Sequence, residues 1–130
     1  MPTPDEEFIK QLRATFQVEA EEHLQAIATR LLALEKAVSP ADRKEVAEVI
    51  YREAHSLKGA ARAVDLLEIE TLCQAMETVF SAWKRNAASP PAGVLDLMHK
   101  CLDVTRSLMT APASILPALL HGRDALLAQL

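Results

Sequence analysis

The sequence predicts an all-α fold, an antiparallel four-helix bundle with an additional fifth helix at its C-terminal end. Apolar residues recur three or four positions apart through most of the 130 residues, which is the spacing of one helix face. Half of the residues are apolar, only three are glycine, and no segment alternates as a half-buried strand does. Short polar breaks divide the pattern into five segments, and short connections favour antiparallel neighbours.

The first two helices are expected at about residues 6–36 and 41–64. The apolar positions of the first are Ile9, Leu12, Phe16, Ala20, Leu24, Ile27, Leu31 and Leu34. Ser39 and Pro40 interrupt the pattern, because serine caps helix N-termini and proline fits the first helical position. The second helix therefore starts behind Ser39 and carries His55 in its last third.

Three further helices are expected at about residues 67–85, 92–109 and 114–129. A tight connection near Asp65 joins the second helix to the third, and a Ser-Pro-Pro segment at residues 89–91 ends the loop before the fourth. The five helices make one domain over residues 1–130. Because the helical pattern runs to Leu130 without a capping residue, we expect the domain to be a piece of a longer protein.

The amino-acid composition argues against several classes of binding partner. The net charge of −4 and the pI near 5.5 give no general attraction to nucleic acid or to an anionic membrane. No segment approaches the roughly 18 uninterrupted apolar residues of a membrane span. Cys73 and Cys101 fall on apolar helix faces without the spacing of a metal site, which suits buried thiols in a reducing cytoplasm. We expect a soluble, cytoplasmic, monomeric domain that binds neither nucleic acid nor membrane.

His55 is the most informative candidate residue. Successive residues of a helix are about 100° apart around its axis. Five residues therefore lie within roughly 60° of His55 on the same face, namely Tyr51, Arg52, Lys58, Gly59 and Arg62. The imidazole is thus displayed among cations on the face opposite the apolar one. Gly59 costs the helix about 1 kcal/mol relative to alanine and leaves the surface beside the ring without a side chain. The pattern indicates a site that a large partner approaches.

The third helix is expected to supply a partner for the imidazole. Its polar stripe, next to the apolar face, consists of Glu70, Gln74, Glu77 and Ser81. On spacing, Glu77 reaches His55, with Gln74 as the alternative. A carboxylate that accepts from one ring nitrogen fixes the tautomer and leaves the other nitrogen as a nucleophile. With cations nearby to meet phosphate oxygens, the arrangement suits the acceptance of a phosphoryl group.

Spacing alone leaves alternatives open. His55 can be an ordinary exposed histidine and Glu77 a solvated helix edge, in which case the domain is a non-catalytic helical interaction module. A metal-binding bundle is disfavoured, because Ala20 and Arg52 occupy the glutamate positions of the Glu-x-x-His pairs that end at His23 and His55. The sequence contains no phosphate-binding glycine loop, so we expect no ATP site, cofactor or metal.

The motif around His55 resembles a known family. Residues 54–61, Ala-His-Ser-Leu-Lys-Gly-Ala-Ala, closely resemble the His-x-x-Lys-Gly signature of histidine-containing phosphotransfer (HPt) domains, in particular the N-terminal domain of CheA-type chemotaxis histidine kinases. Residues 16–24 and 31–35 are similar to the opening helix of those domains, and residues 72–80 to their third helix. The similarity covers about residues 8–86, and the last two helices match only in length and pattern.

The resemblance implies a role for each residue of the motif. His55 is the phosphorylated residue, Lys58 lies beside the phosphoryl group, and Gly59 leaves room for the partner. Glu77 falls at the position of the glutamate that hydrogen-bonds the imidazole. In this family the ATP-binding domain of a histidine kinase, in cis or in trans, phosphorylates the histidine, and the phosphoryl group passes to an aspartate of a response-regulator receiver domain. The domain is then a phosphoacceptor and relay in two-component signalling, and the N-terminal part of a longer histidine kinase.

The sequence departs from the family pattern at two positions. Asp65 stands where a glycine usually ends the motif, which leaves the end of the second helix open. Arg62 replaces a common small residue and adds a charge. Together with Arg52, Gln74 and Gly59, Arg62 is expected to form the surface that contacts the phosphate or the partner.

Overall fold

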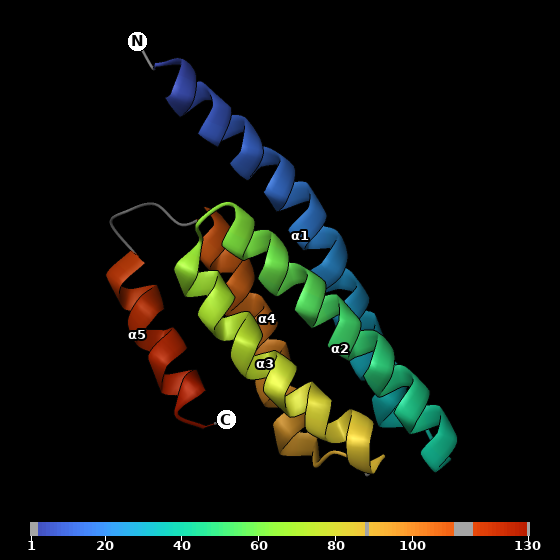
Figure 1. The fold of residues 1–130 in the computed structure, drawn as a ribbon. Coiled ribbons are helices and arrows are strands. Elements are labelled where there is room, and N and C mark those ends of the chain that lie inside the picture. Colours follow the sequence, from blue (N-terminus) through green and yellow to red (C-terminus); the bar gives the residue numbers. More distant parts are fainter. Residues whose placement is uncertain (1–2, 88, 111–115, 130) are drawn as a thin grey trace.

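The computed structural model describes residues 3–87, 89–110 and 116–129 and contains five helices in them (Figure 1). The four long helices are α1 (Pro4–Lys36), α2 (Pro40–Ala63), α3 (Leu67–Asn86) and α4 (Ala92–Thr110). Consecutive helices run antiparallel, and contacts of α1 and α3 with both α2 and α4 close a four-helix bundle. The shorter α5 (Leu116–Leu127) packs against α4 and α3. The predicted all-α bundle with a fifth helix is confirmed.

Local capping sets the helix ends. α1 begins two residues earlier than expected, because the Thr3 hydroxyl accepts from the Glu6 N–H at 3.1 Å and the Glu6 carboxylate accepts from the Thr3 N–H at 3.3 Å. α2 begins behind Ser39, whose hydroxyl accepts from the Asp42 N–H at 3.1 Å. The other bounds of the long helices differ from the expected ones by at most one residue. The expected start of the fifth helix near residue 114 lies outside the described residues.

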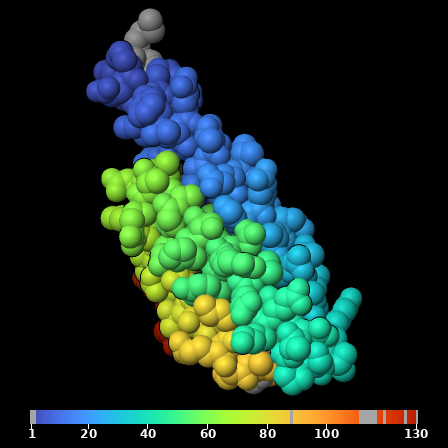
Figure 2. All heavy atoms as spheres, turned by 45° about the vertical axis from the view of Figure 1, so that its right-hand side comes forward, coloured from blue at the N-terminus to red at the C-terminus, as the bar shows by residue number. Residues whose placement is uncertain are grey.

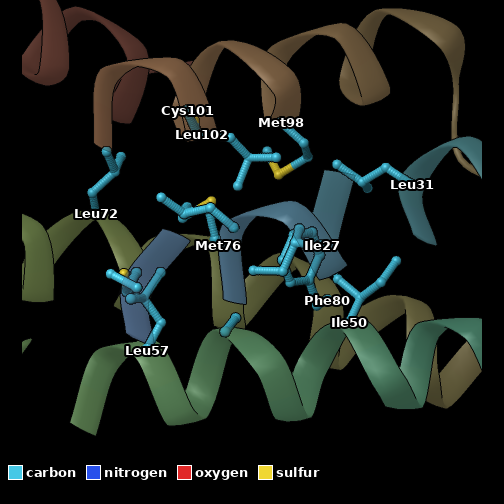
Figure 3. Close-up of a cluster of buried hydrophobic side chains, with 14 of the residues drawn as sticks. Ile27, Leu31, Ile50, Leu57, Leu72, Met76, Phe80, Met98, Cys101 and Leu102 are labelled. Atoms are coloured by element: carbon cyan, nitrogen blue, oxygen red, sulfur yellow. The ribbon is translucent and has the colours of Figure 1, made fainter. Parts of the chain in front are cut away.

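Buried apolar side chains from the four long helices meet in one core (Figure 3). The side chains labelled there are Ile27 and Leu31 from α1, Ile50 and Leu57 from α2, Leu72, Met76 and Phe80 from α3, and Met98, Cys101 and Leu102 from α4. Full burial of one such large side chain stabilises the fold by about 1.5–3 kcal/mol. The core therefore fixes which face of each helix turns inward.

Within the described residues, no helix is long and apolar enough to span a membrane.

The first turns of α1 extend past the rest of the bundle (Figure 1). Ile9 and Leu12, which belong to the expected apolar face of this helix, are exposed together with Phe8, and burial begins at Phe16. α1 has 33 residues whereas α2 has 24, so its neighbour is too short to cover it. Periodic spacing predicts a helix face and does not say how far the neighbouring helices reach.

Both cysteines are free and fully buried. Burial raises the pKa of the Cys73 thiol to about 12, and the nearby Glu77 carboxylate adds to the effect. Burial alone raises the pKa of Cys101 to about 11. At neutral pH both side chains are therefore protonated thiols that pack as small apolar groups.

The connection between α2 and α3 is a tight turn in which Asp65 adopts a left-handed conformation, with φ at 64°. The Leu66 N–H donates to the Ala61 carbonyl at 2.9 Å and the Asp65 N–H to the Arg62 carbonyl at 3.1 Å, the two bonds of a Schellman motif. Glycine is favoured at such a position because a Cβ is strained there. The aspartate nevertheless keeps the turn, and α2 ends at Ala63.

Replacing Asp65 with glycine is expected to raise the free energy of unfolding by about 0.5–1 kcal/mol, because relief of the left-handed strain outweighs the added freedom of the unfolded chain. Urea denaturation measures the change. Ala63→Gly, in the last turn of α2, is the matched control and should lower the stability by about 1 kcal/mol. If Asp65→Gly instead lowered the free energy of unfolding by as much as the control, the aspartate side chain itself would be shown to stabilise the turn.

Candidate functional site

Facing side chains of α2 and α3 define the candidate site. From the turn outward, Arg62 contacts Glu70, Lys58 contacts Gln74, His55 contacts Glu77, and Lys84 lies over Tyr51. Each successive pair lies about one helical turn further along α2, and along α3 the steps are one turn, except that Lys84 lies about two turns beyond Glu77. The antiparallel register of this hairpin therefore decides which residue of α3 meets the imidazole.

The His55 imidazole is exposed although two nearby residues of α2 are buried. Its side chain is 61% exposed, whereas Ala54 and Leu57 are fully buried in the core. The helical period then turns His55 outward. Gly59, one turn further on, is exposed, and a Cβ placed there would meet no atom within 4 Å. Figure 2 shows one face of the molecule, on which α2 (teal to green) lies between α1 (blue) and α3 (yellow).

Glu77 approaches the imidazole from α3. Its Oε2 lies 3.2 Å from Nδ1 of His55 and 2.8 Å from Nζ of Lys58. An ionised carboxylate can only accept, so Nδ1 is the protonated nitrogen that donates to it, and Nε2 keeps its lone pair. Gln74, the alternative partner, instead accepts a hydrogen bond from Lys58 at 3.1 Å. The catalytic roles of these residues stay predictions.

The charge of Glu77 is held in a nearly buried position. Burial by itself raises the pKa of this carboxyl, but hydrogen bonds from Lys58 and His55, together with their charges, outweigh the burial. The pKa of Glu77 therefore lies below its ordinary value of 4.5. At neutral pH the group is an ionised acceptor for Nδ1 of His55.

The predicted cations of the site differ in their surroundings. The Lys58 side chain is 13% exposed and donates to both Glu77 and Gln74. The Arg62 side chain is 69% exposed and pairs with Glu70 at 2.7 Å. Arg52 is exposed on the same helix. Lys58 thus balances a buried carboxylate next to the imidazole, whereas the arginines belong to the open surface.

Tyr51 contacts His55 in a way that the sequence analysis did not predict. The two rings are stacked, with centroids 6.1 Å apart and an interplanar angle of 19°. Nζ of Lys84 lies 4.1 Å from the centroid of the Tyr51 ring. The spacing of four residues between Tyr51 and His55 is a signal for a helical pair that could have been read. The contact of Lys84 depends on the register of α3 and carries no such signal.

His23 makes a second unforeseen contact. Its Nδ1 lies 2.5 Å from the Glu53 carboxylate and links α1 to α2. Of the other two histidines, His121 is exposed and His99 is half-buried. In the part of the chain that the structure describes, no three His, Cys, Asp or Glu side chains gather as metal ligands would. His55 is therefore the histidine that combines exposure with a buried carboxylate partner.

Fold and site together define a class of protein, a helical bundle that presents one histidine nitrogen on an open face. Residues 11–108 match the family model of the Hpt domain. The chain belongs to the Hpt domain family, and the resemblance found in the sequence is confirmed. Members of this family carry phosphoryl groups on a histidine in two-component signalling.

Similar curated proteins are all chemotaxis proteins CheA. The protein from Listeria monocytogenes is 35% identical over 95 residues, which cover 73% of this chain and 15% of the relative. The protein from Treponema pallidum is 29% identical over 104 residues, covering 80% of this chain and 12% of the relative. The protein from Cereibacter sphaeroides is 28% identical over 119 residues, which cover 92% of this chain and 17% of the relative. The chain spans less than a fifth of the length of each of these relatives.

Glu77→Gln is expected to reduce the loss of folding stability that the domain suffers as the pH is lowered. The folded state lowers the pKa of Glu77, so the stabilisation by its charge is complete above about pH 4.5 and is lost as the pH falls through the lower folded value. At neutral pH the variant should be less stable by about 1–3 kcal/mol, because Lys58 loses its charged acceptor. Urea denaturation across about pH 7 to pH 3 measures the difference. A difference that stays constant over this range would contradict the account.

Proposed function

We propose that Nε2 of His55 accepts a phosphoryl group from the ATP-binding domain of a histidine kinase, in cis or in trans, and passes it to an aspartate of a response-regulator receiver domain. The observation that carries the proposal is the exposed imidazole whose Nδ1 lies 3.2 Å from a buried, ionised carboxylate. Membership of the Hpt domain family and the similarity to CheA proteins support it. We place the relay in a chemotaxis-type pathway in the cytoplasm, where buried free thiols such as Cys73 persist.

In the first step, the lone pair of Nε2 attacks the γ-phosphorus of ATP held by the kinase domain. A nitrogen–phosphorus bond forms, the bond to the bridging oxygen breaks, and ADP leaves with the electron pair. The ring keeps its proton on Nδ1 and gains positive charge, which the Glu77 carboxylate at 3.2 Å stabilises. Because Glu77 stays ionised at neutral pH, this stabilisation is in place before the attack.

In the second step, a carboxylate oxygen of the receiver aspartate attacks the same phosphorus. The nitrogen–phosphorus bond breaks and its electrons return to Nε2, so the neutral imidazole and its hydrogen bond to Glu77 are restored. The domain needs only to present the group, because positioning and charge complementarity supply most of the catalysis of phosphoryl transfer.

The surrounding residues serve the charge and the partner. Lys58 lies against the carboxylate that holds the imidazole, and we assign it to the phosphoryl oxygens. Arg62, Arg52 and Gln74 are exposed around this centre and form the surface that the partner contacts. Gly59 keeps that surface low because it has no side chain, and the space in which a Cβ would stand is open beyond its own helix backbone.

The direct test incubates the domain with ATP and the kinase domains of the three CheA relatives. Acid-labile phosphate is expected on His55, located by mass spectrometry, and is expected to leave when a receiver domain is added. His55→Gln should abolish the signal, and His99→Gln, the matched control, should keep it. Absence of phosphate with all three kinases, or its persistence in His55→Gln, would favour the alternative of a non-catalytic interaction module.

Gly59 provides a separate test of the docking surface. Gly59→Gln is expected to raise the free energy of unfolding by about 0.5–1 kcal/mol, because the site is open and glycine is a poor helix former. The same side chain should obstruct the partner and raise the KM for phosphotransfer without abolishing it. Steady-state kinetics and urea denaturation measure the two effects. An unchanged KM in a stabilised variant would show that the partner docks elsewhere.

A further inference from the structure

We infer that Tyr51 is a positioning residue that holds the plane of the His55 ring for phosphoryl transfer. This inference rests on the proposed function, because it concerns how the same imidazole is set for attack. The two rings stack with centroids 6.1 Å apart and an interplanar angle of 19°. This separation lies in the range of about 4.5–7 Å in which offset-stacked aromatic pairs attract each other.

The hydrogen bond to Glu77 leaves one motion of the imidazole unrestrained. A single contact at Nδ1 sets the tautomer and one direction of the ring, but a hydrogen bond tolerates a range of angles, so the ring can still rotate to some extent about χ1 and χ2. The His55 side chain is 61% exposed, so close packing does not block that rotation. The stacked Tyr51 ring resists it, because a turning imidazole would leave the offset-stacked contact in which the two rings lie. Tyr51 thereby directs Nε2 along one line.

Tyr51 is itself fixed from two sides. It packs against the hydrophobic core. In addition, Nζ of Lys84 lies 4.1 Å from the centroid of its ring, within reach of a cation–π interaction. Lys84 and Glu77 both belong to α3. One helix therefore restrains the imidazole twice, directly through the Glu77 carboxylate and indirectly through Lys84 and Tyr51.

The test uses phosphoramidate as donor, because this small molecule phosphorylates histidine without a docked protein. Tyr51→Leu is expected to lower the rate constant for His55 by about two- to tenfold, and Lys84→Met by about two- to fivefold. Tyr51→Phe should keep the wild-type rate, because the stacked ring remains. Glu48→Gln is the matched control: Glu48 lines the same hollow of about 220 Å³ as Tyr51 and Lys84, and its rate should not change.

Nuclear magnetic resonance supplies a readout that a loss of fold stability alone would not move. The His55 ring protons should lose the ring-current shift of the stacked tyrosine in Tyr51→Leu and keep it in Tyr51→Phe. A wild-type rate in Tyr51→Leu, or a failure of Tyr51→Phe to restore it, would overturn the inference. If Tyr51→Leu does not fold, an unchanged rate in Lys84→Met overturns it instead. Wild-type protein that is phosphorylated by neither phosphoramidate nor kinase at His55 would overturn the proposed function as well.

Discussion

The register between α2 and α3 is the constraint on which the site depends. The turn at Asp65 joins the two helices without slack, and their buried faces lock the pairing that brings Glu77 to 3.2 Å from His55. A shift of α3 by one turn would place Cys73 or Ser81 opposite the imidazole. Neither side chain offers a carboxylate to accept from Nδ1. The chemistry of the exposed histidine is therefore decided by packing on the opposite face of its helix.

The site divides into a nearly buried part that carries an ion pair and an exposed part that carries the free ring nitrogen of His55. Glu77 and Lys58 form a nearly buried ion pair at 2.8 Å, and such pairs add little net stability because desolvation offsets their attraction. The value of this pair lies in orientation, since it keeps an ionised acceptor fixed behind Nδ1 of His55. The exposed part, with Nε2 and Gly59, stays open to solvent.

Much of this arrangement could be predicted from the sequence because it follows helix periodicity. The spacing of apolar residues and the Ser39 cap predicted the positions of the helices, and the polar stripe of α3 predicted Glu77 as the partner of His55. Other features depend on where a neighbouring helix ends or how two helices pair, as in the exposed Ile9 of the first turns and the contact of Lys84 with Tyr51. The approach of Glu53 to His23 likewise requires the packing of α1 on α2. Spacing along one helix carries no information about such contacts.

We expect Glu77 to hold His55 with its proton on Nδ1, which leaves Nε2 as the nucleophile. Long-range proton–nitrogen correlation by nuclear magnetic resonance reports directly which ring nitrogen is protonated. In the neutral imidazole, Nδ1 of His55 is expected to carry the proton and Nε2 to lack it, and Glu77→Gln is expected to weaken this preference. A wild-type neutral ring protonated on Nε2, with Nδ1 bare, would show that Glu77 does not set the tautomer.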